Sequence, residues 1–251
     1  MDARLRDEPL SRDVRIFNSG TELAAFAAEH VVAVLREAIR GHGGASAALS
    51  GGTTPGKTYE RIAEISPGRS IHWGHVHLFW GDERCVPPDD ERSNFRLAYR
   101  SLICRIPIPR ANVHRMRGEL LPREGAEDYE RELGAHFGRR TLPSFDLLLL
   151  GLGADGHTAS LFPESSPLSE ASRWVTTAKN EGLERLTLTL PVLNAARSIL
   201  FIVTGREKAE VAAKILSGES RARGLPAAMV RPQGGKVAWF LDAAAASLLG
   251  A

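Results

Sequence analysis

The stretch from Phe145 to Pro163 constrains the fold of this chain more than any other. Its first six residues, Phe145 to Leu150, form an apolar run with almost no polar break, and the run stops at the loop Gly-Leu-Gly-Ala-Asp-Gly-His. A short run of this kind is typical of a strand buried on both faces inside a parallel sheet. Ligands bind beyond the carboxyl ends of such strands. We therefore expect Asp155 and His157, which follow the run, to lie at a ligand site.

Three more short apolar runs occur along the 251-residue chain, and each is followed, directly or after a loop, by apolar residues at helical spacing. Alternating strands and helices predict an α/β fold, with a mostly parallel sheet and helices on both faces. We expect one such domain over residues 14–251, after a polar lead-in over residues 1–13. In a later strand-like segment, leucines alternate with Thr187 and Thr189, which predicts a more polar face there. The three runs are residues 45–49, 76–80 and 198–203.

Charge and composition exclude several classes of protein. The 32 basic and 30 acidic residues give a net charge of +2, which is too balanced to indicate a nucleic acid or an anionic membrane as partner. No apolar stretch approaches the ~20 residues of a membrane helix, and the polar amino terminus does not resemble a signal peptide. With only Cys85 and Cys104, a disulfide framework is not expected. These features predict a cytoplasmic protein.

The segment from Ser50 to Tyr59 follows the predicted strand at residues 45–49 and precedes a helical pattern. A strand, a glycine turn and a helix form an arrangement that binds phosphate, through backbone N–H groups such as those of Gly51, Gly52 and Thr53 and through the positive end of the helix dipole. The segment also satisfies the nucleotide-binding pattern GxxxxGK[ST] with Lys57. However, Pro55 predicts a helix capped by Thr54, and the loop before it is too short to wrap a triphosphate. A single-phosphate site is favoured, with a nucleotide site and a plain turn as alternatives.

Two further cations are expected at the same edge of the sheet. Arg84 belongs to an Asp-Glu-Arg cluster that begins at Asp82, just after the predicted strand at residues 76–80, and its guanidinium could clamp a phosphate. An ion pair at the strand end is the alternative interpretation. Lys208 lies in the first turn of a predicted helix, where a lysine opposes the helix dipole and so hints at an anion between them.

Two other interpretations of this region, a metal site and a cysteine nucleophile, have weaker support. Histidines 72, 75 and 77 suggest a metal site, but they lie before or at the opening of the strand, the end away from the expected ligand edge. Cys85 could be a nucleophile, yet no histidine adjoins it in sequence, and most single cysteines are small buried apolar residues.

The loop after Leu150 also matches the dinucleotide fingerprint GxGxxG. The match is poor, because Pro163 stops any helix after less than two turns and no carboxylate follows at the distance that the fingerprint requires. What remains is His157, two residues from Asp155. A histidine can take up and return a proton near neutral pH, and Asp155 can fix its tautomer. Ser160 is a conceivable nucleophile, but it lacks the GxSxG elbow.

The combination of these segments resembles the 6-phosphogluconolactonase family. The resemblance runs from about residue 14 to residue 248, and the family's superfamily also includes glucosamine-6-phosphate deaminase, which shares the first loop and the Asp-Gly-His turn. The Asp-Glu-Arg, Ser-Asn and DGHTASLFP motifs favour the lactonase. The matching segments are LSGGTTPGKTYERIA (49–63), FWGDERCVPPDDERSNFRLA (79–98), FDLLLLGLGADGHTASLFP (145–163) and TGREKA (204–209).

The resemblance implies a Rossmann-like three-layer sandwich and hydrolysis of 6-phospho-D-glucono-1,5-lactone to 6-phosphogluconate in the oxidative pentose phosphate pathway. It implies that His157 is the catalytic base, and that the Gly51-Gly52-Thr53 amides, Arg84 and Lys208 bind phosphate. Arg185 and Asp82 are expected as further substrate contacts. No cofactor and no metal are expected, the small-molecule lactone is the expected partner, and a monomer is the default. The alternative is a glucosamine-6-phosphate deaminase-like isomerase, with Asp82 as the base.

Overall fold

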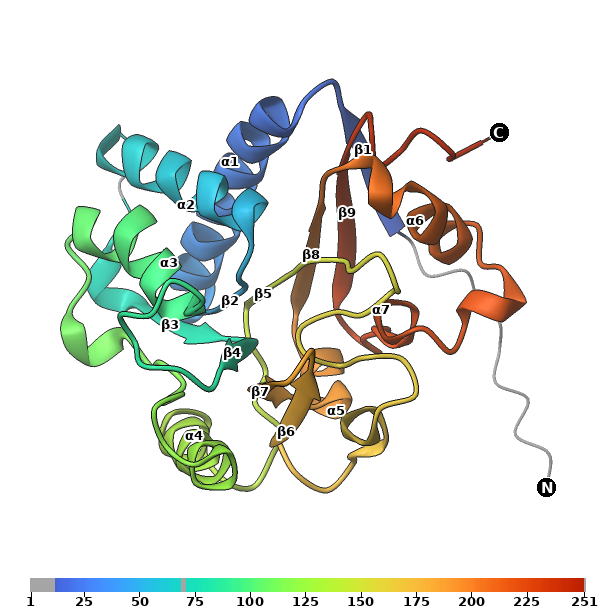
Figure 1. The fold of residues 1–251 in the computed structure, drawn as a ribbon. Coiled ribbons are helices and arrows are strands. Elements are labelled where there is room, and N and C mark those ends of the chain that lie inside the picture. Colours follow the sequence, from blue (N-terminus) through green and yellow to red (C-terminus); the bar gives the residue numbers. More distant parts are fainter. Residues whose placement is uncertain (1–11, 69–70, 251) are drawn as a thin grey trace.

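The computed structural model describes residues 12–68 and 71–250, and a parallel sheet of six strands forms its centre (Figure 1). Neighbouring strands in the sheet follow the order β1-β9-β8-β5-β2-β3, and every pair is parallel. The expected strands at residues 45–49, 76–80 and 198–203 are confirmed with the predicted bounds. In chain order these strands are β1 (Arg12–Phe17), β2 (Ala45–Leu49), β3 (Val76–Trp80), β5 (Leu147–Leu150), β8 (Ser198–Val203) and β9 (Lys236–Asp242).

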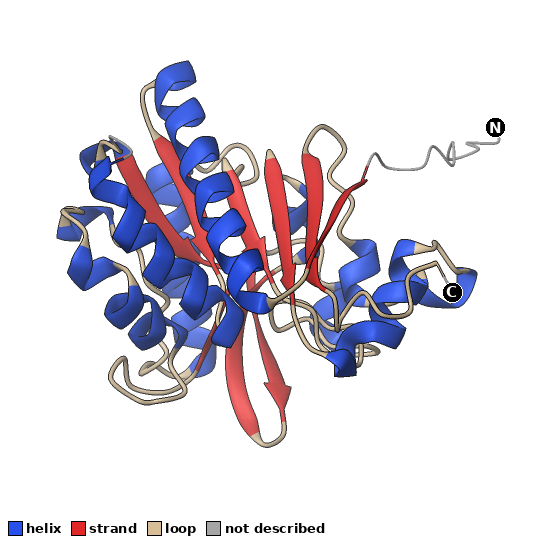
Figure 2. Cartoon of the chain, turned by 90° about the horizontal axis from the view of Figure 1, so that it is seen from above, coloured by secondary structure: helices blue, strands red, loops and turns tan. Residues whose placement is uncertain are grey.

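Helices cover both faces of this sheet, as Figure 2 shows. The arrangement confirms the predicted three-layer α/β fold, in which each strand is buried between helices. The α-helices are α1 (Gly20–His42), α2 (Thr53–Ile65), α3 (Asn94–Ser101), α4 (Pro122–Phe137), α5 (Leu190–Asn194), α6 (Ala209–Leu216) and α7 (Pro226–Met229). Short 3₁₀ turns are η1 (Ser66–Gly68), η2 (Trp73–His75), η3 (Ile103–Arg105), η4 (Arg110–Asn112), η5 (Ser166–Ser169), η6 (Arg206–Lys208) and η7 (Ser220–Ala222).

Helix α1 illustrates how the sequence produces this packing. Ser19 accepts a hydrogen bond from the backbone N–H of Glu22 and so caps the first turn. The apolar stripe on one side of the helix is buried against α2 and strands β2, β5 and β9. The helix ends at His42, and its C-cap Gly43 has a φ of 86°, a left-handed conformation that glycine adopts without a steric penalty. Beyond this cap, the chain passes through Gly44 and enters β2 at Ala45.

A second, three-stranded antiparallel sheet was not predicted. Its strands follow the order β4-β7-β6, with β4 at Asp82–Arg84, β6 at Val175–Asn180 and β7 at Leu183–Leu188. Gly81 joins the two sheets, because its N–H donates to the carbonyl of Leu49 at 2.9 Å and its carbonyl accepts from the N–H of Leu188 at 2.9 Å. A three-residue strand such as β4 has too few positions to show a periodic pattern. Pairing with β7, which lies far from β4 in the sequence, is what holds β4 in an extended conformation.

One local expectation was wrong. Helix α2 begins at Thr53 with Gly52 as its first flanking residue, so Thr54 is not the cap. The polar positions expected at Thr187 and Thr189 are fully buried: Thr187 accepts a hydrogen bond from the N–H of Ser160, and Thr189 donates to the carbonyl of Arg173. Their hydroxyl groups find partners there, which offsets the cost of removing them from water.

The ends of the chain bear on the expected domain bounds. Most of the lead-in expected over residues 1–13 lies outside the described residues, and β1 already begins at Arg12. The division into a lead-in and one domain over residues 14–251 therefore stays a prediction. Among the described helices, none has the length and apolar character needed to span a membrane.

Candidate active site

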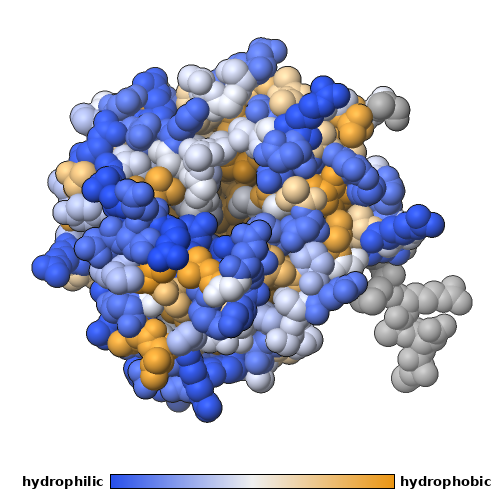
Figure 3. All heavy atoms as spheres, in the orientation of Figure 1, coloured by the Kyte–Doolittle hydropathy of each residue, from blue (hydrophilic) through white to orange (hydrophobic). Residues whose placement is uncertain are grey.

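A cavity of about 390 Å³ lies at the carboxyl edge of the parallel sheet, beyond the ends of β2, β3, β5 and β8. Figure 3 shows the surface hollowed near the middle of this face. This is the edge at which parallel sheets bind ligands. The structure places eight of the nine predicted site residues in its lining; Asp155 lies outside, behind His157. The eight are Gly51, Gly52, Thr53, Asp82, Arg84, His157, Arg185 and Lys208.

The β2–α2 loop forms one wall of the cavity. Gly51 has to be a glycine, because a Cβ atom there would overlap the side-chain amide of Asn94. The hydroxyl groups of Thr54 and Thr204 lie 2.6 Å apart, which ties this loop to the end of β8. Lys57 is exposed and does not belong to the cavity lining. The lysine that a nucleotide-binding loop would need is therefore not directed at the site.

His157 forms part of the opposite wall, with Asp155 behind it. Its Nδ1 atom lies 2.6 Å from Oδ1 of Asp155, and the same oxygen accepts a hydrogen bond from the backbone N–H of His157 at 3.0 Å. Partial burial raises the pKa of Asp155, but these hydrogen bonds from His157 outweigh burial and hold the pKa below its usual value. An ionised Asp155 favours the tautomer with hydrogen on Nδ1, so Nε2 of His157 is the nitrogen able to accept a proton.

The glycines of this loop allow the pair to form. The N–H of Gly153 donates to the carbonyl of His157 at 2.8 Å, which folds the loop back on itself. A Cβ atom on Gly153 would overlap the imidazole of His157. The ring of Phe162 also packs against the imidazole, with the two centroids 4.8 Å apart. The contacts with Asp155, Gly153 and Phe162 together limit the orientations that the ring of His157 can adopt.

Asp82 and Asn94 form a buried polar network at the floor of the cavity. The Asp82 carboxylate accepts a hydrogen bond from the hydroxyl of Ser160 at 2.6 Å and one from the amide of Asn94 at 3.2 Å. The side-chain oxygen of Asn94 in turn accepts from Arg84 at 2.7 Å. Ser160 is fully buried and outside the cavity lining, so the structure uses this hydroxyl to orient Asp82 and does not offer it as a nucleophile.

Glu83 anchors the segment that carries this network. One carboxylate oxygen accepts from the backbone N–H groups of Arg84 and Asn94, at 2.8 and 2.7 Å. The other accepts from the N–H of Phe95 at 2.8 Å and the hydroxyl of Ser93 at 3.0 Å. Burial raises the pKa of Glu83, and the backbone hydrogen bonds partly offset that effect. The side chain therefore joins β4 to the start of α3.

Three cations line the cavity. Arg84 and Arg185 occupy directly paired positions on β4 and β7, and the Nε atom of each is buried with no hydrogen-bond partner among the described residues. Burial lowers the pKa of Arg185, and the charge of Arg84 lowers it further. Lys208, at the end of η6, lines the same cavity; its Nζ atom lies 3.7 Å from the carboxylate of Glu207. Such a set of cations, with unused donors, fits an anion.

Sequence reasoning missed several of these groups as parts of the site. Asn94, Thr204 and Glu207 line the cavity although none was singled out. The Ser-Asn pair at residues 93–94 had been noted only as a motif, and its position at the start of a helix was the available signal. Cys85 lies outside the lining, and burial raises its thiol pKa to about 11, with Glu184 and Glu83 adding to the shift. That thiol is not an activated nucleophile.

The chain is similar to named proteins over most of its length. Residues 18–239 match the family described as glucosamine-6-phosphate isomerases/6-phosphogluconolactonase. A 6-phosphogluconolactonase from Synechocystis is 40% identical over 211 residues, which cover 83% of this chain and 86% of that protein. The 6-phosphogluconolactonase of Homo sapiens is 39% identical over 241 residues, covering 94% and 93%. A crystal structure of 6-phosphogluconolactonase from Thermotoga maritima aligns with a TM-score of 0.79 at 31% identity, covering 92% of this chain and 99% of that one.

Proposed function

The chain belongs to the family of glucosamine-6-phosphate isomerases and 6-phosphogluconolactonases, and from that premise we propose that His157 is the base with which it opens a sugar-phosphate lactone. The enzyme is a lactone hydrolase of carbohydrate metabolism. It converts 6-phospho-D-glucono-1,5-lactone and water to 6-phospho-D-gluconate in the oxidative pentose phosphate pathway.

One observation carries the assignment: a single cavity is lined by an oriented imidazole and by cations with unused donors. His157 has Nδ1 engaged by Asp155, which leaves Nε2 for proton transfer. Arg84 and Arg185 each keep a buried Nε–H without a partner in the described part of the chain, and Lys208 lines the same space. A substrate with a phosphate at one end and an ester at the other matches this arrangement. The phosphate would satisfy the arginines and place the ester near the imidazole.

The reaction needs no covalent intermediate, because a lactone is an activated ester. Nε2 of His157 removes a proton from water as the oxygen of that water attacks C1 of the lactone. The ring oxygen then leaves from C1 and takes a proton from the imidazolium, which restores the neutral base. Asp155 stabilises the imidazolium between the two transfers. General base catalysis of this kind contributes about 100- to 10,000-fold to the rate.

The phosphate contacts contribute to the rate as well as to affinity. Binding energy gained at the phosphate, far from C1, can hold the ester in a reactive position. The network of Asp82, Asn94 and Arg84 fixes the guanidinium before the substrate arrives. The amides of Gly51, Gly52 and Thr53 lie at the start of α2, where the helix dipole also favours an anion.

The test is a lactone hydrolysis assay, corrected for the spontaneous rate, with EDTA present. We expect rapid opening of the phosphorylated lactone and little activity on the lactone without phosphate. Release of ammonia from glucosamine 6-phosphate, with no lactonase activity, would instead support the deaminase alternative with Asp82 as the base. Lactonase activity that survives replacement of His157 would remove this residue from the mechanism. A cytoplasmic monomer remains our expectation for the working enzyme.

A further inference from the structure

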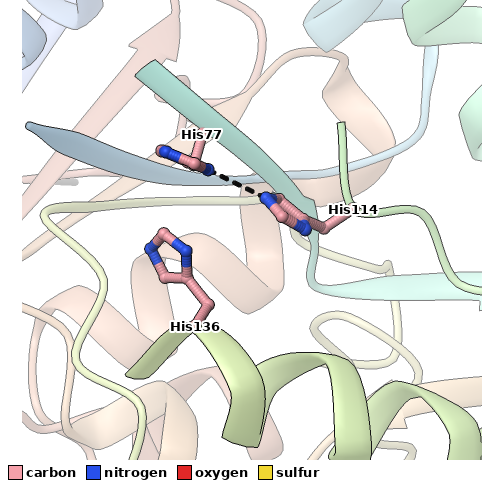
Figure 4. A group of neighbouring side chains, drawn as sticks. All are labelled: His77, His114 and His136. Carbon is pink, nitrogen blue, oxygen red and sulfur yellow. Dashed lines mark hydrogen bonds between the residues drawn. The ribbon is translucent and has the colours of Figure 1, made fainter. Parts of the chain in front are cut away.

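A cluster of three histidines lies at the edge of the sheet opposite the cavity. His77 is the second residue of β3, His114 follows a single parallel bridge between Leu78 and Val113, and His136 belongs to the last turn of α4. Each ring offers one nitrogen such that all three atoms lie within 4.8 Å of one another. Figure 4 shows the rings of His77 and His114 joined by a hydrogen bond, with the ring of His136 facing them. We propose that these three imidazoles bind a late first-row divalent metal ion, with Zn²⁺ as the best fit.

The hydrogen bonds of His114 prepare it for this role. Its Nδ1 atom lies 2.5 Å from the carboxylate of Glu132, so Nδ1 carries the hydrogen and Nε2 presents a lone pair. A carboxylate that holds the far nitrogen of a histidine ligand is the usual outer partner in metal sites, where it fixes the tautomer and raises the basicity of the ligand. Glu132 and His136 both lie on α4, four residues apart, so one helix supplies a ligand and the outer carboxylate.

The nitrogens of His77 and His114 are spaced nearly as in a metal site, whereas the 4.8 Å spread of the three nitrogens means that the ring of His136 has to move closer. Nδ1 of His77 lies 2.9 Å from Nε2 of His114. Two nitrogens bound to one tetrahedral Zn²⁺ at 2.0–2.1 Å lie about 3.4 Å apart, so the pair has to open by only a few tenths of an ångström. The metal would replace the hydrogen now shared between the two rings. His136 makes no hydrogen bond with any other described residue, which leaves its ring nitrogens available.

The backbone around the cluster is fixed, as a metal site requires. The N–H of His114 donates to the carbonyl of Leu78 at 2.8 Å, which holds this segment against β3. Phe79 stacks on the ring of His114, with centroids 4.3 Å apart and planes inclined by 7°. Stacking accounts for the plane of that ring, but it does not require the nitrogens of three rings to converge. His136 is exposed, so an ion can enter from solvent.

This cluster differs from the set considered from sequence. His72, His75 and His77 were the candidates there, but only His77 belongs to the cluster. His72 and His75 pack edge-to-face with centroids 6.4 Å apart and contribute no ligand atom. His114 and His136 are 37 and 59 residues from His77 in the chain, and only the fold brings them together. Three neutral imidazoles favour Zn²⁺, Cu²⁺, Ni²⁺ or Co²⁺ over Mg²⁺ and Ca²⁺, which prefer oxygen ligands.

The experiment titrates the full-length, chelator-treated protein with Zn²⁺ in competition with a chromophoric chelator at neutral pH. We expect one ion per chain, with a Kd below about 1 µM. His136→Gln should weaken binding at least about 100-fold, and Glu132→Gln about 10- to 100-fold. The visible spectrum of the Co²⁺ complex should show nitrogen ligation in the wild type and lose it in His136→Gln. Because His136 is exposed and far from the cavity, this variant should fold and hydrolyse lactone normally.

Two matched controls separate this site from others. His72→Gln removes a neighbouring histidine outside the cluster, and His157→Gln removes the imidazole of the cavity; both should bind Zn²⁺ like the wild type. Zn²⁺ should also raise the Tm of the wild type and of these controls, but not that of His136→Gln. The proposal is overturned if no ion binds more tightly than about 10 µM. Wild-type affinity in His136→Gln, or loss of the ion in His157→Gln, would overturn it equally.

Discussion

Arg84 and Arg185 stand opposite each other on the antiparallel strands β4 and β7, and each has a buried Nε atom without a partner among the described residues. Two like charges in paired positions destabilise a sheet. The unused donors add to the cost, because a buried N–H without an acceptor loses its hydration. An anion bound between the guanidinium groups would relieve both costs. The pair therefore destabilises the enzyme when the cavity is empty, and a bound phosphate should remove that cost.

The first prediction concerns Arg185. Replacing it with Gln removes one charged donor set, and a hydrogen bond to a charged group contributes about 1.5–3 kcal/mol. We expect kcat/KM for the phosphorylated lactone to fall about 10- to 100-fold. Activity on the lactone without phosphate should change little. The matched control is Lys57→Gln, which neutralises an exposed lysine outside the cavity and should leave both rates unchanged. Equal losses on the two lactones would contradict a phosphate contact.

The second prediction concerns His157. His157→Gln keeps a polar side chain of similar length but cannot cycle a proton, so kcat should fall about 100- to 10,000-fold. The Kd for 6-phosphogluconate should stay within a few-fold of wild type, because the phosphate contacts are intact. Kinetics after correction for spontaneous hydrolysis, with product binding measured by calorimetry, check both expectations. Parallel loss of product binding would indicate a damaged cavity, not a missing base.

The third prediction concerns Asp155. In Asp155→Asn the amide oxygen can still accept from the backbone and ring of His157, and only the negative charge is lost. We expect kcat to fall about tenfold with KM unchanged, and Asp155→Ala to fall further because the orientation of the ring is lost as well. A drop in Asp155→Asn as large as that in His157→Gln would mean that the tautomer itself had changed.

The lowered pKa of Asp155 gives this variant a signature in stability too. The folded pKa is below the usual aspartate value of about 3.9, so the stabilising contribution is fully present above that value. It is lost as the pH falls through the folded pKa. The wild type should therefore have a higher Tm than Asp155→Asn near neutral pH, and the difference should vanish at strongly acidic pH. A difference that grows on acidification would contradict the direction of the shift.

The sequence predicted the parts of the fold that depend only on residues close together in the chain. The apolar runs of β2, β3 and β8 need only neighbouring residues to be recognised. The glycine loops and the turn around His157 also follow their strands directly, so the sheet edge could be anticipated from strand order. The motif resemblance then named the residues, and eight of nine line one cavity. Their roles in the reaction stay predictions.

The rest depends on contacts between distant segments. Arg84 and Arg185 are 101 residues apart, and they pair only because β4 and β7, which show no shared sequence pattern, lie side by side. The hydrogen bond from Ser160 to Asp82 likewise joins a loop to β4 across 78 residues of sequence. In the sequence, Ser160 looked like a possible nucleophile, because a hydroxyl beside a catalytic turn has no visible partner until the fold supplies one. The histidine cluster around His114 was missed for the same reason.

The fourth prediction concerns Glu83. In Glu83→Gln, an NH₂ group, which can only donate, replaces one carboxylate oxygen. It then faces either the N–H of Phe95 and the hydroxyl of Ser93, or the N–H groups of Arg84 and Asn94. In both cases donors face donors and lose their acceptor. Unpaired buried donors cost about 1–3 kcal/mol, so the Tm should fall by roughly 3–10 °C for a chain of this size. Glu210→Gln is the control, because Glu210 pairs only with Lys214 on an exposed helix face and should leave the Tm unchanged.

The fifth prediction separates the two cysteines. Burial, with Glu184 and Glu83, raises the pKa of Cys85 to about 11, so at pH 8 the reactive thiolate is roughly one part in a thousand. Cys104 is exposed and should be alkylated by iodoacetamide at pH 8 while Cys85 is not. Mass spectrometry of the peptides measures both. Raising the pH toward 10 should reduce the difference in alkylation rate between Cys104 and Cys85, because the thiolate fraction of Cys85 grows about tenfold per pH unit.

The effect of alkylation on activity is a further check. Since neither thiol lines the cavity, alkylation at Cys104 should leave lactone hydrolysis unchanged. Rapid modification of Cys85 at pH 8, with loss of activity, would return this thiol to the candidates for the nucleophile.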